Sequence, residues 1–155
     1  MTEPINVHEI AVESDPNDPP GYRSRGRRFG PTIGAERLGG SVYELDPGES
    51  ICPYHYEVVE EEWLIVVTGT PTLRDPDGEH ELVPGDLVSF PPTPDGGHKV
   101  TNRSDGVVRL LMVSTMPKND LSICVYPDSE KVGVWPWPGR RLRITESLDY
   151  FDGEV

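Results

Sequence analysis

The fold of this chain is decided by residues 47–69, which read PGESICPYHYEVVEEEWLIVVTG. A Pro-Gly turn leads into an expected strand that carries His55 and Glu57, and Glu62 begins a second, largely apolar strand. Side chains two residues apart on a strand point to the same face, so His55 and Glu57 can converge. His98 follows in a later turn region rich in Gly and Pro. Imidazoles and carboxylates gathered inside a small β-barrel are typical of a mononuclear metal site.

The rest of the chain has many short strand patterns separated by turn signals. Among these signals are Asp46-Pro47-Gly48 and Asp75-Pro76-Asp77-Gly78, in which Gly permits a positive φ and Pro fixes φ. We expect strands at residues 41–45, 51–57, 61–68, 70–74, 80–83, 86–90, 98–102, 107–115 and 122–126. Short strands at this regular spacing indicate an all-β barrel or jelly roll, whose closure removes exposed sheet edges.

Two motifs resemble those of the cupin superfamily. The first family motif reads Gly, several residues, His-x-His, three or four residues, Glu, six residues, Gly. The chain supplies Gly48, His55, Glu57, Glu62 and Gly69, with Glu57 in the place of the second His. The gap from Gly48 to His55 is one residue longer than usual.

The second cupin motif follows the turn after the expected strand at 80–83. It reads Gly85, Pro91, Gly96-Gly97-His98 and Asn102, with a slightly long turn before His98. The resemblance covers about residues 40–115. It implies a cupin-type double-stranded β-helix, or jelly-roll barrel, similar to that of small single-domain cupins.

The resemblance also implies a metal site. Its ligands would be His55, Glu57, Glu62 and His98, and the cofactor a divalent ion such as Fe, Mn, Zn or Ni. Two His and two Glu leave no net charge around such an ion, which favours hard ions such as Fe(II) or Mn(II). Without a metal, burial would raise the pKa of Glu57 or Glu62. Two alternatives stay open: His55 as an ordinary core histidine, and Glu61 instead of Glu62 as the inward residue.

Three regions are expected. Residues 1–20 are interpreted as a flexible N-terminal arm, residues 21–126 as the cupin barrel, and residues 127–155 as a C-terminal extension that packs on the barrel or on a partner. In the extension, Trp135 and Trp137 could line a ligand mouth or a dimer interface, or pin the tail to the barrel wall. The resemblance implies a homodimer.

The charge excludes some partners. A net charge of −13 argues against nucleic acid and anionic membranes, which both need clustered positive charge. The basic cluster at residues 22–28 could hold an anionic ligand or an acidic segment of a partner subunit. It could equally be a solvated loop or first strand. The start of the chain lacks a signal-peptide pattern, so we expect a cytoplasmic protein in which Cys52 and Cys124 are free thiols.

Two functions remain open. In the first, a metal-binding cupin acts on a small oxygenated molecule by dioxygenase- or isomerase-type chemistry. In the second, a non-catalytic cupin captures a small ligand, with a degenerate metal site. The state of the metal discriminates between them, because fold resemblance alone does not determine function. His80 and His8 are expected to lie outside the site.

Overall fold

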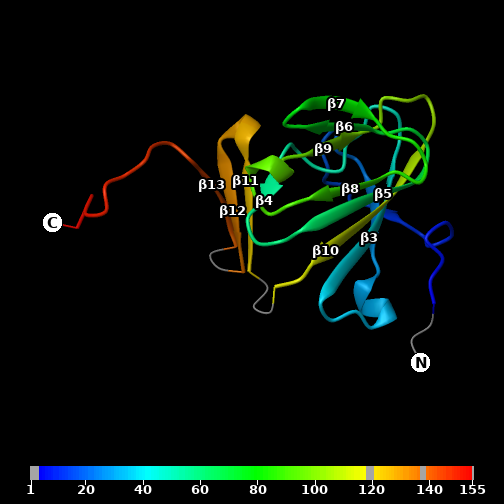
Figure 1. The fold of residues 1–155 in the computed structure, drawn as a ribbon, viewed down its shortest axis with the longest axis horizontal. Helices are drawn as coiled ribbons and strands as arrows, with labels where there is room; N and C mark the ends of the chain where they lie inside the picture. The colour runs from blue at the N-terminus through cyan, green and yellow to red at the C-terminus, as the bar shows by residue number, and fades with distance from the viewer. Residues whose placement is uncertain (1–3, 118–120, 137–138, 155) are drawn as a thin grey trace.

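One wall of the molecule is a six-stranded antiparallel sheet (Figure 1). The computed structural model describes residues 4–117, 121–136 and 139–154. The strand order of this sheet is β1-β2-β3-β10-β5-β8. Its strands are β1 (Glu13–Ser14), β2 (Arg25–Arg28), β3 (Leu38–Leu45), β10 (Val108–Thr115), β5 (Glu62–Thr68) and β8 (Leu87–Phe90). A three-stranded sheet with the order β7-β6-β9 lies beside it. It consists of β6 (Thr72–Asp75), β7 (Gly78–Glu81) and β9 (Lys99–Thr101).

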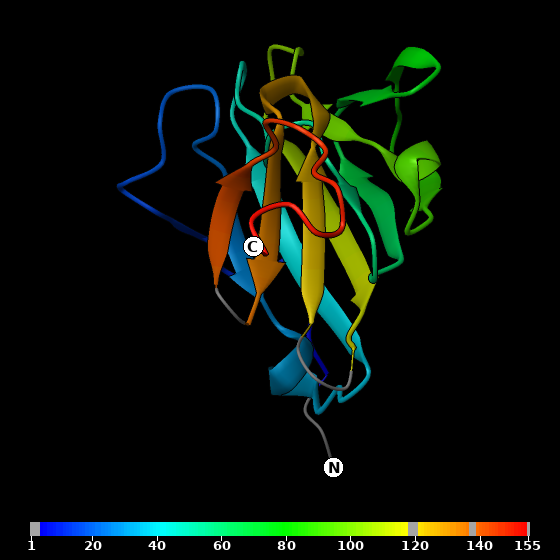
Figure 2. The same ribbon diagram turned by 90° about the vertical axis from the view of Figure 1, so that its left-hand side faces the viewer.

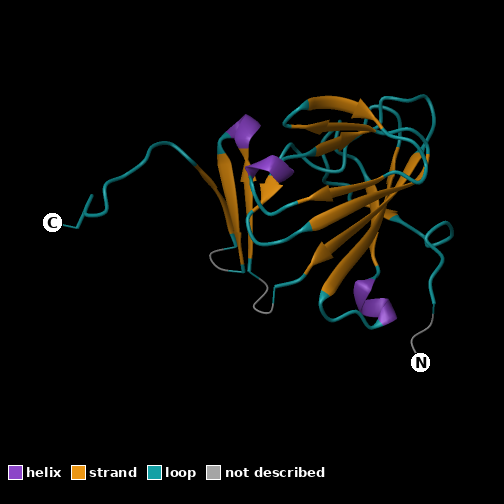
Figure 3. Ribbon diagram, viewed as in Figure 1, coloured by secondary structure: helices purple, strands orange, loops and turns teal. Residues whose placement is uncertain are grey.

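The hydrophobic core fills the space between these two sheets. Leu64 and Val66 of β5 and Leu110 of β10 pack in one cluster with Leu73 of β6 and Val100 of β9. Burial alternates along β5 because successive side chains of a strand point to opposite faces. The cupin-type barrel expected from the sequence is therefore confirmed as an all-β fold, and its only helical elements in the described residues are short turns (Figure 3). These turns are η1 (Gly30–Ile33), η2 (Pro94–Gly96) and η3 (Pro127–Ser129).

Gly69 ends β5 for a steric reason. Its φ of 81° lies in the left-handed region that favours glycine. A Cβ there would also come within 2.9 Å of the Val107 carbonyl oxygen and the Val108 Cα. The glycine that closes the first motif thus lets the chain turn directly against β10.

A four-stranded sheet joins the first part of the C-terminal extension to the barrel (Figure 2), while the chain after β13 leads away from it (Figure 1). Its order is β13-β12-β11-β4, with β13 (Arg140–Arg143), β12 (Lys131–Trp135), β11 (Ser122–Tyr126) and β4 (Tyr56–Glu57). The extension therefore continues the chain as a β-hairpin on β11. The Arg141 guanidinium lies over the Trp135 ring, with its Cζ atom 4.9 Å from the ring centroid. Trp137 is outside the described residues. None of the helical turns in the described chain has the length or the apolar character of a membrane span.

The strand expected at 51–57 is wrong in its extent. Only Tyr56–Glu57 form a strand there, while residues 51–54 bend and His55 makes an isolated bridge. Pro53 explains the break, because proline cannot donate a ladder hydrogen bond. The bend has a consequence for the site: His55 pairs with the barrel, whereas Glu57 pairs with β11.

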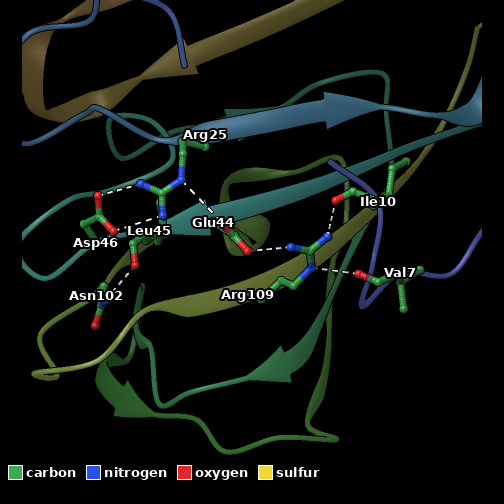
Figure 4. Close-up of polar contacts among 8 residues, drawn as sticks. All are labelled: Val7, Ile10, Arg25, Glu44, Leu45, Asp46, Asn102 and Arg109. Carbon is green, nitrogen blue, oxygen red and sulfur yellow. Dashed lines mark hydrogen bonds and ion pairs between the residues drawn. The ribbon is translucent and has the colours of Figure 1, made fainter. Parts of the chain in front are cut away.

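The N-terminal segment is tied to the barrel by Arg109 of β10 (Figure 4). The buried Arg109 guanidinium donates from Nε to the Val7 carbonyl at 2.7 Å, and from Nη2 to the Ile10 carbonyl. Its Nη1 faces Glu44, which also accepts from Arg25 of β2. Residues 7–10 are thus held through their backbone by a side chain of the central sheet.

Candidate metal centre

Two histidines meet through a backbone bridge. His55 N donates to the His98 carbonyl at 3.1 Å, and His98 N donates to the His55 carbonyl at 2.8 Å. The two imidazole rings lie 4.6 Å apart between centroids. Both residues are buried, and Phe90 of β8 stacks on the His98 ring at 3.7 Å. The bridge therefore fixes both side chains against the barrel interior.

The hydrogen bonds of both rings fix the same tautomer. His55 Nδ1 lies 3.0 Å from the Pro53 carbonyl oxygen, and His98 Nδ1 lies 2.9 Å from the Gly96 carbonyl oxygen. A carbonyl oxygen only accepts, so we assign the proton of each neutral ring to Nδ1. Each Nε2 then presents a lone pair. This arrangement, with the remote nitrogen bound to a carbonyl, is the one in which metal-ligating histidines are usually held.

The carboxylate of Glu62 lies opposite these two lone pairs. Its Oε2 is 3.7 Å from His98 Nε2 and 3.9 Å from His55 Nε2, too far for hydrogen bonds. Glu62 opens β5 with its side chain only 18% exposed, and Oε2 has no hydrogen-bond partner among the described residues. A buried carboxylate oxygen without a partner is costly.

Without a bound cation, the surroundings of the site disfavour the charged forms of Glu57, Glu62 and His98. Burial, followed by the charges of Glu57 and Glu60, raises the pKa of Glu62 to about 8. Burial also raises the pKa of Glu57 to about 7, and Glu60 adds repulsion. Burial and the neighbouring His55 lower the pKa of His98 to about 3. The raised carboxylate pKa values expected for a metal-free site are therefore confirmed.

A divalent cation fits the group formed by His55, Glu62 and His98. Each of these residues offers one ligand atom, and the three atoms lie within 4.8 Å of one another. Two neutral imidazoles and one carboxylate suit Zn, Fe, Mn or Ni, and leave coordination positions for water or a ligand. The cation would also give the partnerless Glu62 oxygen an opposite charge.

Glu57 lies near His55, as the sequence predicted, but in a second group. That group contains His55, Glu57 and Cys124 of β11, again with ligand atoms within 4.8 Å of one another. Ser122 Oγ donates to Glu57 Oε2 at 3.4 Å. The structure thus brings His55, Glu62 and His98 together and places Glu57 beside them on the β11 side. A ligand role for Glu57 remains a prediction.

The other candidates fall outside the site. Glu61 is exposed and its Oε1 accepts from Trp63 Nε1 at 2.9 Å, so Glu62 is the inward residue. His80 is exposed and lies 3.1 Å from Asp75, and His8 is exposed in the N-terminal segment. Cys52 and Cys124 are free thiols, as expected. The place of Cys124 beside Glu57 was not predicted, because only the pairing of β11 with β4 brings it there.

A cavity of about 510 Å³ adjoins the three-residue group. Its lining includes His55, Glu62 and His98 together with Arg28 of the basic cluster. It also includes polar side chains for which the sequence indicated no role: Ser41, Tyr43, Glu60 and Ser114. This volume is in the range of small-molecule sites. The site therefore combines a candidate metal group with room for a small polar ligand.

Comparisons with known proteins agree with the fold. Residues 41–114 match the cupin domain family Cupin_2. The structure is similar to that of a sugar phosphate isomerase of the cupin superfamily from Silicibacter pomeroyi, with a TM-score of 0.79 and 25% identity over 91% of this chain and 92% of that one. No curated protein matches the sequence. Residues 41–114 therefore form a cupin domain of the Cupin_2 type, and the fold is that of the small cupin-superfamily proteins.

Two further structures share the fold. An Acidithiobacillus ferrooxidans protein proposed to be a sugar phosphate isomerase has a TM-score of 0.75 and 23% identity, over 88% of this chain and 85% of that one. The polyketide cyclase RemF from Streptomyces resistomycificus has a TM-score of 0.63 and 19% identity, over 100% of this chain and 94% of that one.

Proposed function

We propose that this cupin holds one divalent cation with His55, Glu62 and His98, and acts on a small oxygenated molecule by isomerase-type proton transfer. The observation that carries the metal site is the buried Glu62 Oε2, which finds no hydrogen-bond partner in the described part of the chain and faces the Nε2 atoms of both histidines. The Silicibacter pomeroyi isomerase, which this chain matches over nearly its whole length, supports isomerase-type over dioxygenase-type chemistry.

The residues of the cavity have separable roles in such a reaction. A divalent cation would supply a Lewis acid that polarises a carbonyl or hydroxyl oxygen of the ligand. Glu60 lines the same cavity, and its burial raises its pKa, which makes its carboxylate a stronger base. We assign it the removal of a proton from the hydroxyl-bearing carbon beside the carbonyl and the delivery of a proton to the former carbonyl carbon, while the hydroxyl proton passes to the carbonyl oxygen. Between the two transfers, the proton held by Glu60 can exchange with solvent. The number of hydrogens is then unchanged, as an isomerisation requires.

Tyr43 contributes a neutral hydrogen-bond donor. Burial raises the pKa of its phenol, so the hydroxyl keeps its proton at neutral pH. Tyr43 lies on β3 and lines the cavity together with Glu60. A phenol that stays protonated can orient a ligand oxygen without adding a negative charge to a site already rich in carboxylates.

The second candidate is a cupin that binds a ligand without turnover. This candidate is favoured by Glu57, which stands in the place of the second His of the family motif. Glu57 and Cys124 also form a second group with His55. The two functions differ in proton transfer. A metal-loaded protein that binds a ligand without exchanging its carbon-bound protons belongs to the second class.

A solvent-exchange experiment tests the proposal. Metal-loaded protein is incubated in D₂O with a panel of aldoses and ketoses, free and phosphorylated, and deuterium beside the carbonyl is followed by NMR. We expect exchange and isomer formation with at least one member of the panel. Glu60→Gln should abolish the exchange without changing the bound metal, whereas Glu61→Gln, outside the cavity, should leave it unchanged. Exchange that persists in Glu60→Gln at the wild-type rate would remove Glu60 from the proposed role.

A further inference from the structure

We propose that Arg28 forms an anion-binding subsite in the cavity, so that the ligand is a hydroxylated chain with a carboxylate or phosphate at the end remote from the metal group. This inference rests on the proposed function, because it takes the cavity beside His55, Glu62 and His98 to be the ligand site. It gives the basic cluster at residues 22–28 one specific task and names the class of the ligand.

The register of β2 directs Arg28 to the cavity. Arg28 pairs with Ser41 of β3, and Gly26 pairs with Tyr43. Ser41 and Tyr43 both line the cavity, and so does Arg28. A Cβ on Gly26 would come within 2.9 Å of the Tyr43 ring, so the absence of a side chain there lets β2 lie closely against this face. Alternation along β2 then puts Arg27 on the opposite face.

Within the described part of the chain, Arg28 differs from Arg25 and Arg27 in making no ion pair with a carboxylate, although its charge acts on Glu60 across the cavity. Arg25 pairs with Asp46 at 2.6 Å, and Arg27 pairs with Glu13 at 3.1 Å. Among the described residues, the Arg28 guanidinium makes one polar contact, in which Nη2 donates to the Met116 sulfur at 3.5 Å. A thioether is a weak acceptor, so the planar set of guanidinium donors is available for a stronger one.

The strand order separates the backbone of Arg28 from that of the metal group. The strand order β2-β3-β10-β5 places three strand spacings between Arg28 and Glu62. At 4.7–4.9 Å per spacing, the two strands lie about 14 Å apart along the sheet before their side chains reach inward. A ligand that contacts both ends therefore lies across β3 and β10, within the cavity that both residues line.

Two hydroxyl groups lie between the two ends, beside apolar lining residues such as Met112. Ser41 lies on β3 and Ser114 on β10, the two strands between Arg28 and Glu62. Their hydroxyls donate and accept hydrogen bonds, which matches the hydroxyl groups of a polyol. Repulsion from Glu57, Glu60 and Glu62 disfavours a second anion beside the metal group. The anion is therefore placed at Arg28, where the guanidinium suits both phosphate and carboxylate oxygens.

Calorimetric titration of the metal-loaded full-length protein tests this assignment. The probes are inorganic phosphate, glucose 6-phosphate, gluconate and glucose, and the variants are Arg28→Gln and Arg27→Gln. Arg27→Gln is the matched control, because it removes the same charge from the same strand on the opposite face. Phosphate and carboxylate probes separate the two sources of the anion.

We expect the wild type to bind glucose 6-phosphate or gluconate about ten- to hundredfold more tightly than glucose, because glucose lacks the charge-assisted hydrogen bond to Arg28. Arg28→Gln should remove that preference, and Arg27→Gln should keep it. The assignment is overturned if the two variants behave alike, or if no anionic probe binds the wild type more tightly than Arg28→Gln.

Metal content measured in the same samples separates the two proposals. Arg28-dependent anion binding by a protein that takes up no metal would contradict the metal site and leave the anion subsite standing. A metal-loaded protein whose anion binding is indifferent to Arg28→Gln would contradict the subsite alone.

Discussion

Replacing Glu62 by glutamine should change how the stability of the metal-free protein depends on pH. The pKa of Glu62 is about 8 in the folded protein, against an ordinary value of 4.5. A carboxyl whose pKa is higher in the folded state binds more protons there than in the unfolded state. The free energy of unfolding therefore falls as the pH rises from 4.5 to about 8.

The size of this effect follows from the difference between the two pKa values. The pKa of the Glu62 carboxyl is 4.5 in the unfolded chain and about 8 in the folded protein. At 1.36 kcal/mol per pH unit, the free energy of unfolding therefore falls by about 5 kcal/mol between these two pH values. Part of the pKa shift of Glu62 comes from repulsion by Glu57 and Glu60, and this repulsion weakens when these two residues take up protons. We therefore expect the free energy of unfolding to fall by about 2–5 kcal/mol. Glu62→Gln keeps the shape of the side chain and removes the charge.

Urea denaturation in the presence of a chelator measures the effect. At pH 8.5, Glu62→Gln should be about 2–5 kcal/mol more stable than the wild type, and the difference should shrink towards pH 5. Comparing the two proteins cancels the contribution of His98, whose lowered pKa destabilises both below pH 6.5. Glu61→Gln, on the exposed neighbour, is the control and should follow the wild type. A difference between Glu62→Gln and wild type that does not vary with pH would refute the account of the site.

Three further substitutions have defined outcomes. Glu57→Gln should retain one metal ion per chain and lower the affinity less than tenfold, if the group of His55, Glu62 and His98 holds the ion and Glu57 acts only from the group with Cys124. Loss of the ion on metal titration would show instead that Glu57 is a ligand. Arg109→Met should cost about 2–4 kcal/mol in urea denaturation and expose residues 7–10 to proteolysis; unchanged cleavage would contradict the anchoring. Asn102→Ala should lower the free energy of unfolding by about 2–3 kcal/mol, because Asn102 Nδ2 donates to the buried Leu45 carbonyl at 2.8 Å (Figure 4). The metal content should stay unchanged. A loss of metal would show that Asn102 also positions the site.

The barrel and the three-residue group could be predicted because their signals are local. Turn residues and alternation mark the strands, and the two motifs set the spacing of His55, Glu62 and His98. Glu62 could be preferred to Glu61 from its gap to Gly69, and the structure agrees, because Glu61 contacts the exposed Trp63 instead.

What could not be predicted depends on pairings between distant segments. The ligand role expected for Glu57 remains a prediction, but its place next to Cys124 could not be predicted, because only the pairing of β4 with β11 brings these two residues together. The cavity wall was missed for the same reason. Arg28 lines the cavity only because β2 joins the edge of β3, a register that no short motif encodes.

Elemental analysis tests the central claim most directly. The wild type and Glu62→Gln are purified without chelator, and the metal per chain is measured before and after titration with Zn, Mn and Fe(II). The account predicts about one divalent ion per chain in the wild type, and none retained by Glu62→Gln under the same washing. A wild type that takes up no ion on titration, or a Glu62→Gln variant that retains a full complement, would contradict a metal site built on His55, Glu62 and His98.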